Sequence, residues 1–115
     1  MTLDPRLREL PQRELPGELR LLCASTRTTR GRGLARLDAL PTGHALLLEG
    51  CRSVHTIGMR FALDLVWLDD AGGLVRVDAA VVPGRLRNCR GARAVVECNA
   101  GEGGRFAAAL IPAVH

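Results

Sequence analysis

The sequence contains no lysine and no tyrosine, and its only aromatic side chains are Phe61, Trp67 and Phe106. Binding of single-stranded nucleic acid by stacking needs several exposed rings, so this shortage argues against that class of protein. No stretch approaches the ~20 apolar residues of a membrane-spanning helix, and the charged N-terminal residues are not those of a secretory signal. We therefore expect a cytoplasmic protein without a membrane segment, whose four cysteines are reduced thiols.

All sixteen basic residues are arginines, and the net charge is +4. The excess falls in residues 1–36, which carry eight arginines against four acidic residues, whereas the rest of the chain is balanced. The segment from Arg27 to Arg36 contains four arginines and no acid. Such a run can attract phosphates, so weak nucleic-acid binding through it is one hypothesis. A solvated loop is the simpler interpretation, and we do not expect a nucleic-acid partner.

The length of 115 residues suits one domain. Three prolines in residues 1–17 predict an extended, partly disordered arm, which leaves residues 18–115 as a single β-rich domain. Short apolar or alternating runs predict strands, paired glycines predict a hairpin loop over residues 69–73, and residues 85–92 are expected to be a loop. The expected strands cover residues 18–24, 44–49, 63–68, 74–82 and 92–98, and the expected short helices cover residues 33–40 and 102–110.

The central stretch of the chain resembles a known family. Residues 51–64, Cys-Arg-Ser-Val-His-Thr-Ile-Gly-Met-Arg-Phe-Ala-Leu-Asp, are followed by an apolar strand, a glycine hairpin and a valine-rich return. This pattern is similar to the domain of unknown function 192 family (uncharacterised protein family 0127). The resemblance extends over about residues 20–105. The sequence differs from the usual family pattern at Ala62 and at Cys98-Asn99. The residues at its C-terminal end suggest that the family's last strand is missing or altered.

The resemblance implies a compact, barrel-like β fold with small helices, and it implies no known activity or catalytic residue. Together with the strand pattern, it predicts a mainly β (α+β) fold class. The expected architecture is a compact barrel-like antiparallel or mixed β domain with one or two short helices. Strands and helices do not alternate in βαβ order, so a doubly wound parallel sheet is not expected.

The polar segment 52–60, together with Asp64, is the best candidate for a site. If residues 51–57 are extended, one face carries Cys51, Ser53, His55 and Ile57, and the other carries Arg52, Val54 and Thr56. We expect a binding or accessory module for a small anionic ligand or a protein partner. Two arginines would hold the anion, serine and histidine would hydrogen-bond it, and the aspartate would fix the geometry. Asp64 itself needs a partner, either Arg52, His55, Arg60 or backbone amides of the preceding turn. The candidate ligand-binding residues are Arg52, Ser53, His55, Thr56, Arg60 and Asp64.

An alternative from another class is a small hydrolase that uses Cys51 or Ser53 with His55. It requires the thiol or the hydroxyl in hydrogen-bond contact with the imidazole. A zinc site from Cys51, His55, Cys89 and Cys98 lacks the usual close pair of cysteines, so we expect no metal. No phosphate-binding glycine motif is present, and we expect no cofactor. The ligand and the oligomeric state stay open.

Overall fold

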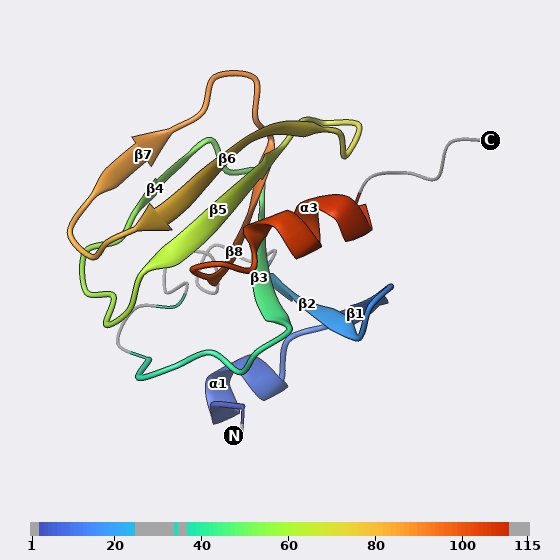
Figure 1. Cartoon of the computed structure of the whole chain (residues 1–115), viewed down its shortest axis with the longest axis vertical. Coiled ribbons are helices and arrows are strands. Elements are labelled where there is room, and N and C mark those ends of the chain that lie inside the picture. The colour runs from blue at the N-terminus through green and yellow to red at the C-terminus, as the bar shows by residue number, and fades with distance from the viewer. Residues whose placement is uncertain (1–2, 25–33, 35–36, 111–115) are drawn as a thin grey trace.

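The computed structural model describes residues 3–24, 34 and 37–110, and it arranges them as two β-sheets and two short helices (Figure 1). One sheet has six strands in the order β1-β2-β3-β8-β5-β6, and the other pairs β4 with β7. In chain order, the helices and strands are α1 (Pro5–Arg8), β1 (Gln12–Leu15), β2 (Leu19–Ala24), β3 (His44–Glu49), β4 (Ser53–His55), β5 (Leu63–Leu68), β6 (Leu74–Val81), β7 (Leu86–Asn88), β8 (Ala94–Asn99) and α3 (Gly103–Leu110).

The large sheet is mixed, because β2 and β3 run parallel while its other neighbouring strands are antiparallel. The predicted fold class is thus confirmed: a compact, mostly β, barrel-like domain with two short helices, in which the large sheet stays open. The strands predicted over residues 44–49 and 63–68 have the predicted bounds. Helix α3 confirms the helix predicted over residues 102–110, apart from its first residue.

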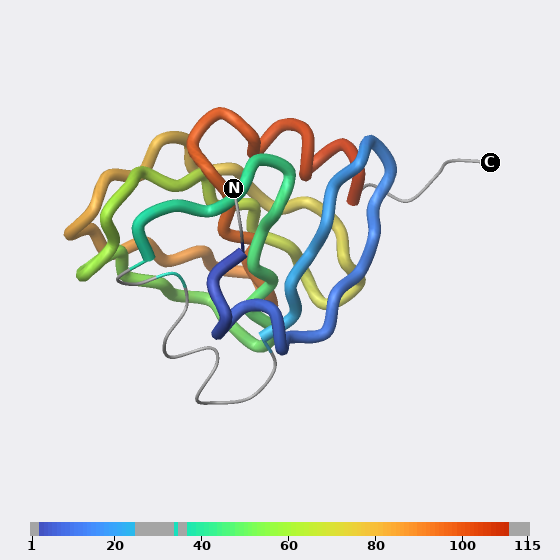
Figure 2. The backbone as a smooth tube through the Cα atoms, turned by 90° about the horizontal axis from the view of Figure 1, so that it is seen from below, coloured from blue at the N-terminus to red at the C-terminus, as the bar shows by residue number. Residues whose placement is uncertain are grey.

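Both faces of the central strands of the large sheet are buried, and each face belongs to a different apolar cluster. Along β5, Leu65 and Trp67 join the cluster that also contains Val54 of β4, whereas Val66 and Leu68 join the cluster of Phe106 in α3. One face is therefore covered by α3 and the other by the smaller sheet. The β1–β2 hairpin and the β4–β7 sheet lie at opposite ends of the molecule (Figure 2).

Two local expectations need correction, and the predicted arm contains two regular elements. Asp4 caps α1 by accepting a hydrogen bond from the Arg6 amide, and β1 pairs with β2. Proline is tolerated in the first turn of a helix. Residues 86–88, expected in a loop, form β7 because β4 supplies a partner strand. Residues 37–40 are not helical, although Leu37 and Leu40 are buried.

Several expectations fall on residues outside the described part of the chain. They include most of the arginine run from Arg27 to Arg36, the start of the helix predicted over residues 33–40, and the ending in which the family's last strand would lie. These stay predictions.

Candidate functional site

Strand β4 presents its residues alternately to the core and to solvent, as the sequence predicts. Val54 is buried in the core, whereas Ser53 and His55 on either side of it are exposed. The antiparallel register places Ser53 opposite Asn88 and His55 opposite Leu86. Cross-strand partners project to the same side of a sheet, so these four side chains form the outer face of the small sheet.

The polar groups of this outer face are paired in a way that does not suit a hydrolase. The Ser53 hydroxyl donates to Asn88 Oδ1 over 2.6 Å, and the Cys51 thiol donates to the Ser53 carbonyl over 3.1 Å. A nucleophile must instead contact its base directly. Among the described residues, no hydrogen bond joins Ser53 to His55. The arrangement that the hydrolase hypothesis requires is therefore missing for the serine.

Thr56 serves the scaffold rather than the surface. It is almost fully buried, and its hydroxyl donates to the Val82 carbonyl over 2.7 Å while accepting from the Arg85 amide over 2.8 Å. Its own amide donates to the Arg85 carbonyl, and its carbonyl accepts from the Gly84 amide. Thr56 thereby joins the turn after β4 to the turn between β6 and β7, so we remove it from the candidate ligand contacts.

Asp64 also has an internal role. Its side chain accepts hydrogen bonds from the amides of Ala80 (2.8 Å), Gly101 (3.0 Å) and Gly103 (2.8 Å). A Cβ atom at Gly103 would lie 2.8 Å from Asp64 Oδ2, so only glycine fits there without a shift. Asp64 therefore joins β6 to the start of α3. The expected partners were wrong, because the donors come from later segments rather than from the preceding turn or a basic side chain.

Arg60 pairs with Asp38 through an exposed salt bridge. Of the six predicted ligand-binding residues, the fold thus leaves Arg52, Ser53 and His55 exposed in or directly before β4, and the other three have partners elsewhere. Arg52 lies at the end of the β4–β7 ladder, where its carbonyl accepts from the Cys89 amide. Arg90 follows Cys89 directly and is exposed like Arg52.

The sequence analysis missed that the segments around β4 and β7 carry arginines but no acidic residues. Residues 50–63 and 79–96, which build β4, β7 and their flanking turns, contain no aspartate or glutamate. The balanced charge of residues 37–115 hides this, because the acids lie on other elements. We call the following exposed residues the β4–β7 surface: Arg52, Ser53, His55, Ile57, Val82, Arg85, Leu86, Asn88 and Arg90.

A second polar cluster links β7 to the edge of the large sheet. Arg76 and Asp78 of β6 form a salt bridge over 2.9 Å, and Arg76 also donates to the Asn88 carbonyl over 2.6 Å. The buried Trp67 donates its indole N–H to Asp78 over 3.0 Å, which supplies the acceptor that its side chain needs. Burial tends to raise the pKa of Asp78, but the bonds from Arg76 and Trp67 outweigh it and keep that pKa below its ordinary value.

Glu97 is a feature that the sequence analysis did not single out. It lies in β8 opposite Leu46 and Leu65 and is only 4% exposed. Among the residues that the structure describes, its Oε1 atom has no hydrogen-bond partner. Burial raises the pKa of Glu97 from its ordinary value of 4.5 to about 7. The signal available in the sequence was an acidic residue inside a strand of buried valines.

The cysteines do not assemble into a metal centre within the described residues, where no three His, Cys, Asp or Glu side chains are grouped closely enough. All four cysteines are free thiols. Burial, with smaller contributions from nearby acids, raises the pKa of Cys98 to about 12. Cys98 is thus a core side chain, and it donates weakly to the Asp64 carbonyl.

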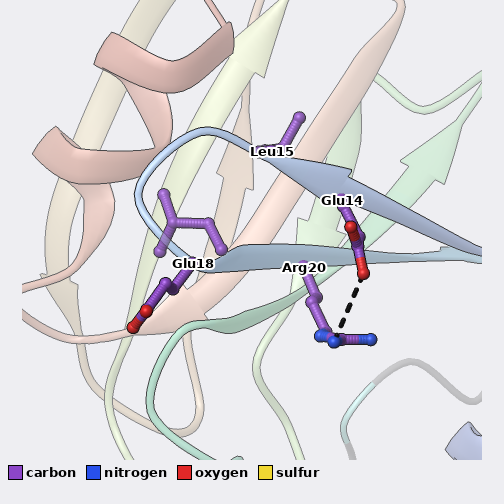
Figure 3. A pocket seen from close by; sticks show the side chains of 5 residues that line it. Glu14, Leu15, Glu18 and Arg20 are labelled. Carbon is purple, nitrogen blue, oxygen red and sulfur yellow. Dashed lines mark ion pairs between the residues drawn. The ribbon is translucent and has the colours of Figure 1, made fainter.

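A hollow of about 450 Å³ lies at the β1–β2 turn, at the other end of the molecule from the β4–β7 surface (Figure 3). Glu14, Glu18 and Arg20 line it together with two leucines. Arg20 is already paired with Glu14 over 3.3 Å. None of the predicted site residues contributes to it.

Comparison with known proteins places this arrangement among uncharacterised relatives. Residues 11–108 match the DUF192 family, described as uncharacterized ACR. No curated protein matches the chain. Within the described residues, no helix is long and apolar enough to cross a membrane.

Two solved structures are similar to this one in fold. One is a Sinorhizobium meliloti protein described as a candidate transcription regulator, with a TM-score of 0.69, 19% identity and coverage of 83% of this chain and 82% of that one. The other is a Novosphingobium aromaticivorans protein of unknown function, with a TM-score of 0.68, 15% identity and coverage of 92% and 93%. At these identities the likeness extends to the fold alone.

Proposed function

Since the chain belongs to the DUF192 family of uncharacterised proteins, which supplies no activity to carry over, we propose a function from the site itself. The protein is a binding module, and the arginine end of its β4–β7 surface takes an anionic group. Arg52 and Arg90 carry the recognition, because their exposed guanidinium groups come from adjoining strand ends.

The absence of acids from both contributing segments is the observation that supports this proposal most. Arg20, Arg60 and Arg76 each pair with a carboxylate. By contrast, residues 50–63 and 79–96 offer no carboxylate of their own to Arg52 or Arg90. A guanidinium group binds carboxylate or phosphate oxygens through two parallel hydrogen bonds, so a bound anion supplies the missing acceptors.

The neighbouring polar groups suit the same role. Ser53 follows Arg52 in the chain, Asn88 lies opposite Ser53, and their side chains are already bonded to each other. The Asn88 amide nitrogen can donate to the oxygen atoms of an anion. His55 lies two residues farther along β4 and can add a further donor. Thr56 and Asp64 hold the scaffold rigid through buried hydrogen bonds, which limits the conformational cost of binding.

The test uses inorganic pyrophosphate and a pair of double variants with equal loss of charge. Arg52→Gln with Arg90→Gln removes the proposed contacts, whereas Arg8→Gln with Arg13→Gln removes two exposed arginines from α1 and β1. Pyrophosphate is expected to raise the melting temperature of the native protein, since a ligand at 100 times its Kd adds about 2.7 kcal/mol. The control variant should respond equally, and the site variant should lose the response.

Two results would contradict the proposal. One is a native protein whose melting temperature and amide NMR shifts at Arg52, Ser53 and Arg90 do not change with pyrophosphate. The other is a site variant that responds as strongly as the control. A shift that the control variant alone abolishes would move the anion site to the β1 end of the molecule.

A further inference from the structure

The other end of the β4–β7 surface is apolar. Ile57 is 64% exposed and Leu86 is 63% exposed, and Val82 beside them is 46% exposed. Leu86 begins β7 opposite His55, and Ile57 lies in the turn after β4. Isolated exposed aliphatic residues are ordinary, but three on segments joined by hydrogen bonds form a patch.

Hydrogen bonds tie the segments of this patch together. Thr56 bonds to the carbonyl of Val82 and the amide of Arg85, so it joins the turn of Ile57 to the turn that leads from Val82 to Leu86 at the start of β7. The hydrogen bond from the Gly84 amide to the Thr56 carbonyl adds a further link. A preorganised patch loses little conformational entropy when a partner covers it.

We propose that the β4–β7 surface docks a segment of a partner protein that combines acidic and aliphatic side chains. The proposal rests on the anion site above and specifies its ligand. The carboxylates of the segment contact Arg52, Arg90 and the exposed Arg85, and its aliphatic side chains cover Ile57, Val82 and Leu86. A strand rises about 3.3 Å per residue, so Ser53 and His55 lie about 7 Å apart along β4. Ile57 is in the turn that follows and lies at most about 13 Å from Ser53. The acidic and aliphatic residues of an extended segment are therefore expected within about four positions of each other.

Charge complementarity and the aliphatic end together favour a protein partner over nucleic acid. Single-stranded nucleic acid binds through aromatic stacking as well as phosphate contacts, and the exposed apolar residues here are aliphatic. A phosphate backbone would leave Ile57 and Leu86 in water. An acidic segment with aliphatic residues satisfies both ends of the surface at once, in the way that apolar anchors and a polar rim work in protein interfaces.

The experiment selects binders without assuming their sequence. A display library of random 12-residue peptides is panned against the native protein, and representative enriched peptides are synthesised and titrated by fluorescence anisotropy. Enriched peptides should be acidic and should contain at least one aliphatic residue. Their Kd should rise at least about tenfold for Ile57→Ser with Leu86→Ser. It should stay within about twofold for the control Leu74→Ser with Val75→Ser, which changes two exposed aliphatic residues of β6.

Chemical-shift mapping on the native protein provides a measurement that does not depend on how well the variants fold. The bound peptide should perturb the amides of Ile57, Val82 and Leu86 together with those of Arg52 and Arg90. The Ile57→Ser, Leu86→Ser variant should also keep the pyrophosphate response, which separates the two proposals.

Several outcomes overturn the inference. Enriched peptides without acidic bias would do so, as would peptides whose affinity falls with the arginine variant but not with the Ile57 and Leu86 variant. The latter result leaves the anion site standing. The surface belongs to a different partner if no peptide is enriched and a 20-nucleotide RNA or DNA, or phosphatidylserine vesicles, bind to it. That binding would have to depend on Ile57 and Leu86 in the same way. No enrichment and no pyrophosphate response would remove both proposals.

Discussion

Two carboxyl groups on neighbouring strands, Asp64 in β5 and Glu97 in β8, are each only 4% exposed but have opposite surroundings. Asp64 accepts hydrogen bonds from three backbone amides. Glu97 faces Leu46 and Leu65, and its Oε1 atom has no partner within the described part of the chain. Although the two side chains are equally buried, the carboxyl group of Asp64 therefore stabilises the fold, whereas the ionised carboxyl group of Glu97 destabilises it. The number of available donors, rather than exposure, decides what a buried carboxyl group does to the fold.

The comparison is tested most severely by removing Asp64. Asp64→Ala should lower the free energy of unfolding by about 3–5 kcal/mol, because three backbone amides, one of them buried, lose their acceptor at once. Urea denaturation followed by circular dichroism measures this change. Asp70→Ala, in the exposed hairpin between β5 and β6, should change stability by less than about 0.5 kcal/mol. If both variants unfold alike, the hydrogen bonds of Asp64 contribute little.

Glu97 should have the opposite effect, and its effect should depend on pH. Its pKa of about 7 in the folded protein lies above the ordinary value of 4.5, so the folded state binds the proton more tightly than the unfolded state. The contribution of Glu97 is therefore most favourable below pH 4.5. It is lost as the pH rises toward 7, and the loss amounts to about 3 kcal/mol at pH 8.

Glu97→Met removes this carboxyl group at similar volume. Relative to the native protein, the variant should gain about 3 kcal/mol at pH 8 and almost nothing at pH 4. Because other acids titrate in both proteins, the difference between the two unfolding curves is the quantity to measure. Glu9→Gln, at an exposed position, should show no such difference. An equal gain at both pH values would mean that packing, not ionisation, separates Met from Glu.

The smallest predicted effect concerns the shift of register between β5 and β6, which falls between Leu63 and Leu65 beside Asp64. Ala80 has a φ of 51°, and its amide donates to Asp64 Oδ1. Glycine adopts this conformation without strain, so Ala80→Gly should stabilise the protein by up to about 1 kcal/mol after the entropy of the unfolded chain is counted. Ala79→Gly, where φ is not positive, should instead lose about 0.5–1 kcal/mol. Thermal unfolding of the two variants distinguishes these signs.

Short-range pattern was enough to locate most of the large sheet. The apolar runs over residues 44–49 and 63–68 and the paired glycines between residues 69 and 73 correspond to β3, β5 and the β5–β6 hairpin. Alternation in β4 correctly predicted that Ser53 and His55 share one side of the strand, opposite Val54. These strands and the hairpin depend on residues only a few positions apart, so their hydrophobic pattern can be recognised in the sequence.

The candidate site could be predicted only in part from the sequence, because its residues come together through pairing of segments that are far apart in the chain. Asn88 reaches Ser53 across 35 positions of sequence, and residues 85–92 have too little pattern to predict a strand. Arg60 and Asp64 look like neighbours of His55 in the chain, but one pairs with Asp38 and the other turns toward the start of α3. The partners of a polar side chain depend on which distant segment the fold brings to it.

By itself, then, the sequence determined the β-rich class, the family resemblance and the strands whose own residues alternate or run apolar. The tertiary structure alone decided which polar residues are internal supports and which remain exposed. It made Asp64 and Thr56 part of the scaffold, and it brought together two acid-free segments around β4 and β7. The physical reason is that hydrogen-bond donors and charges act over a few ångströms in space, whatever their separation along the chain.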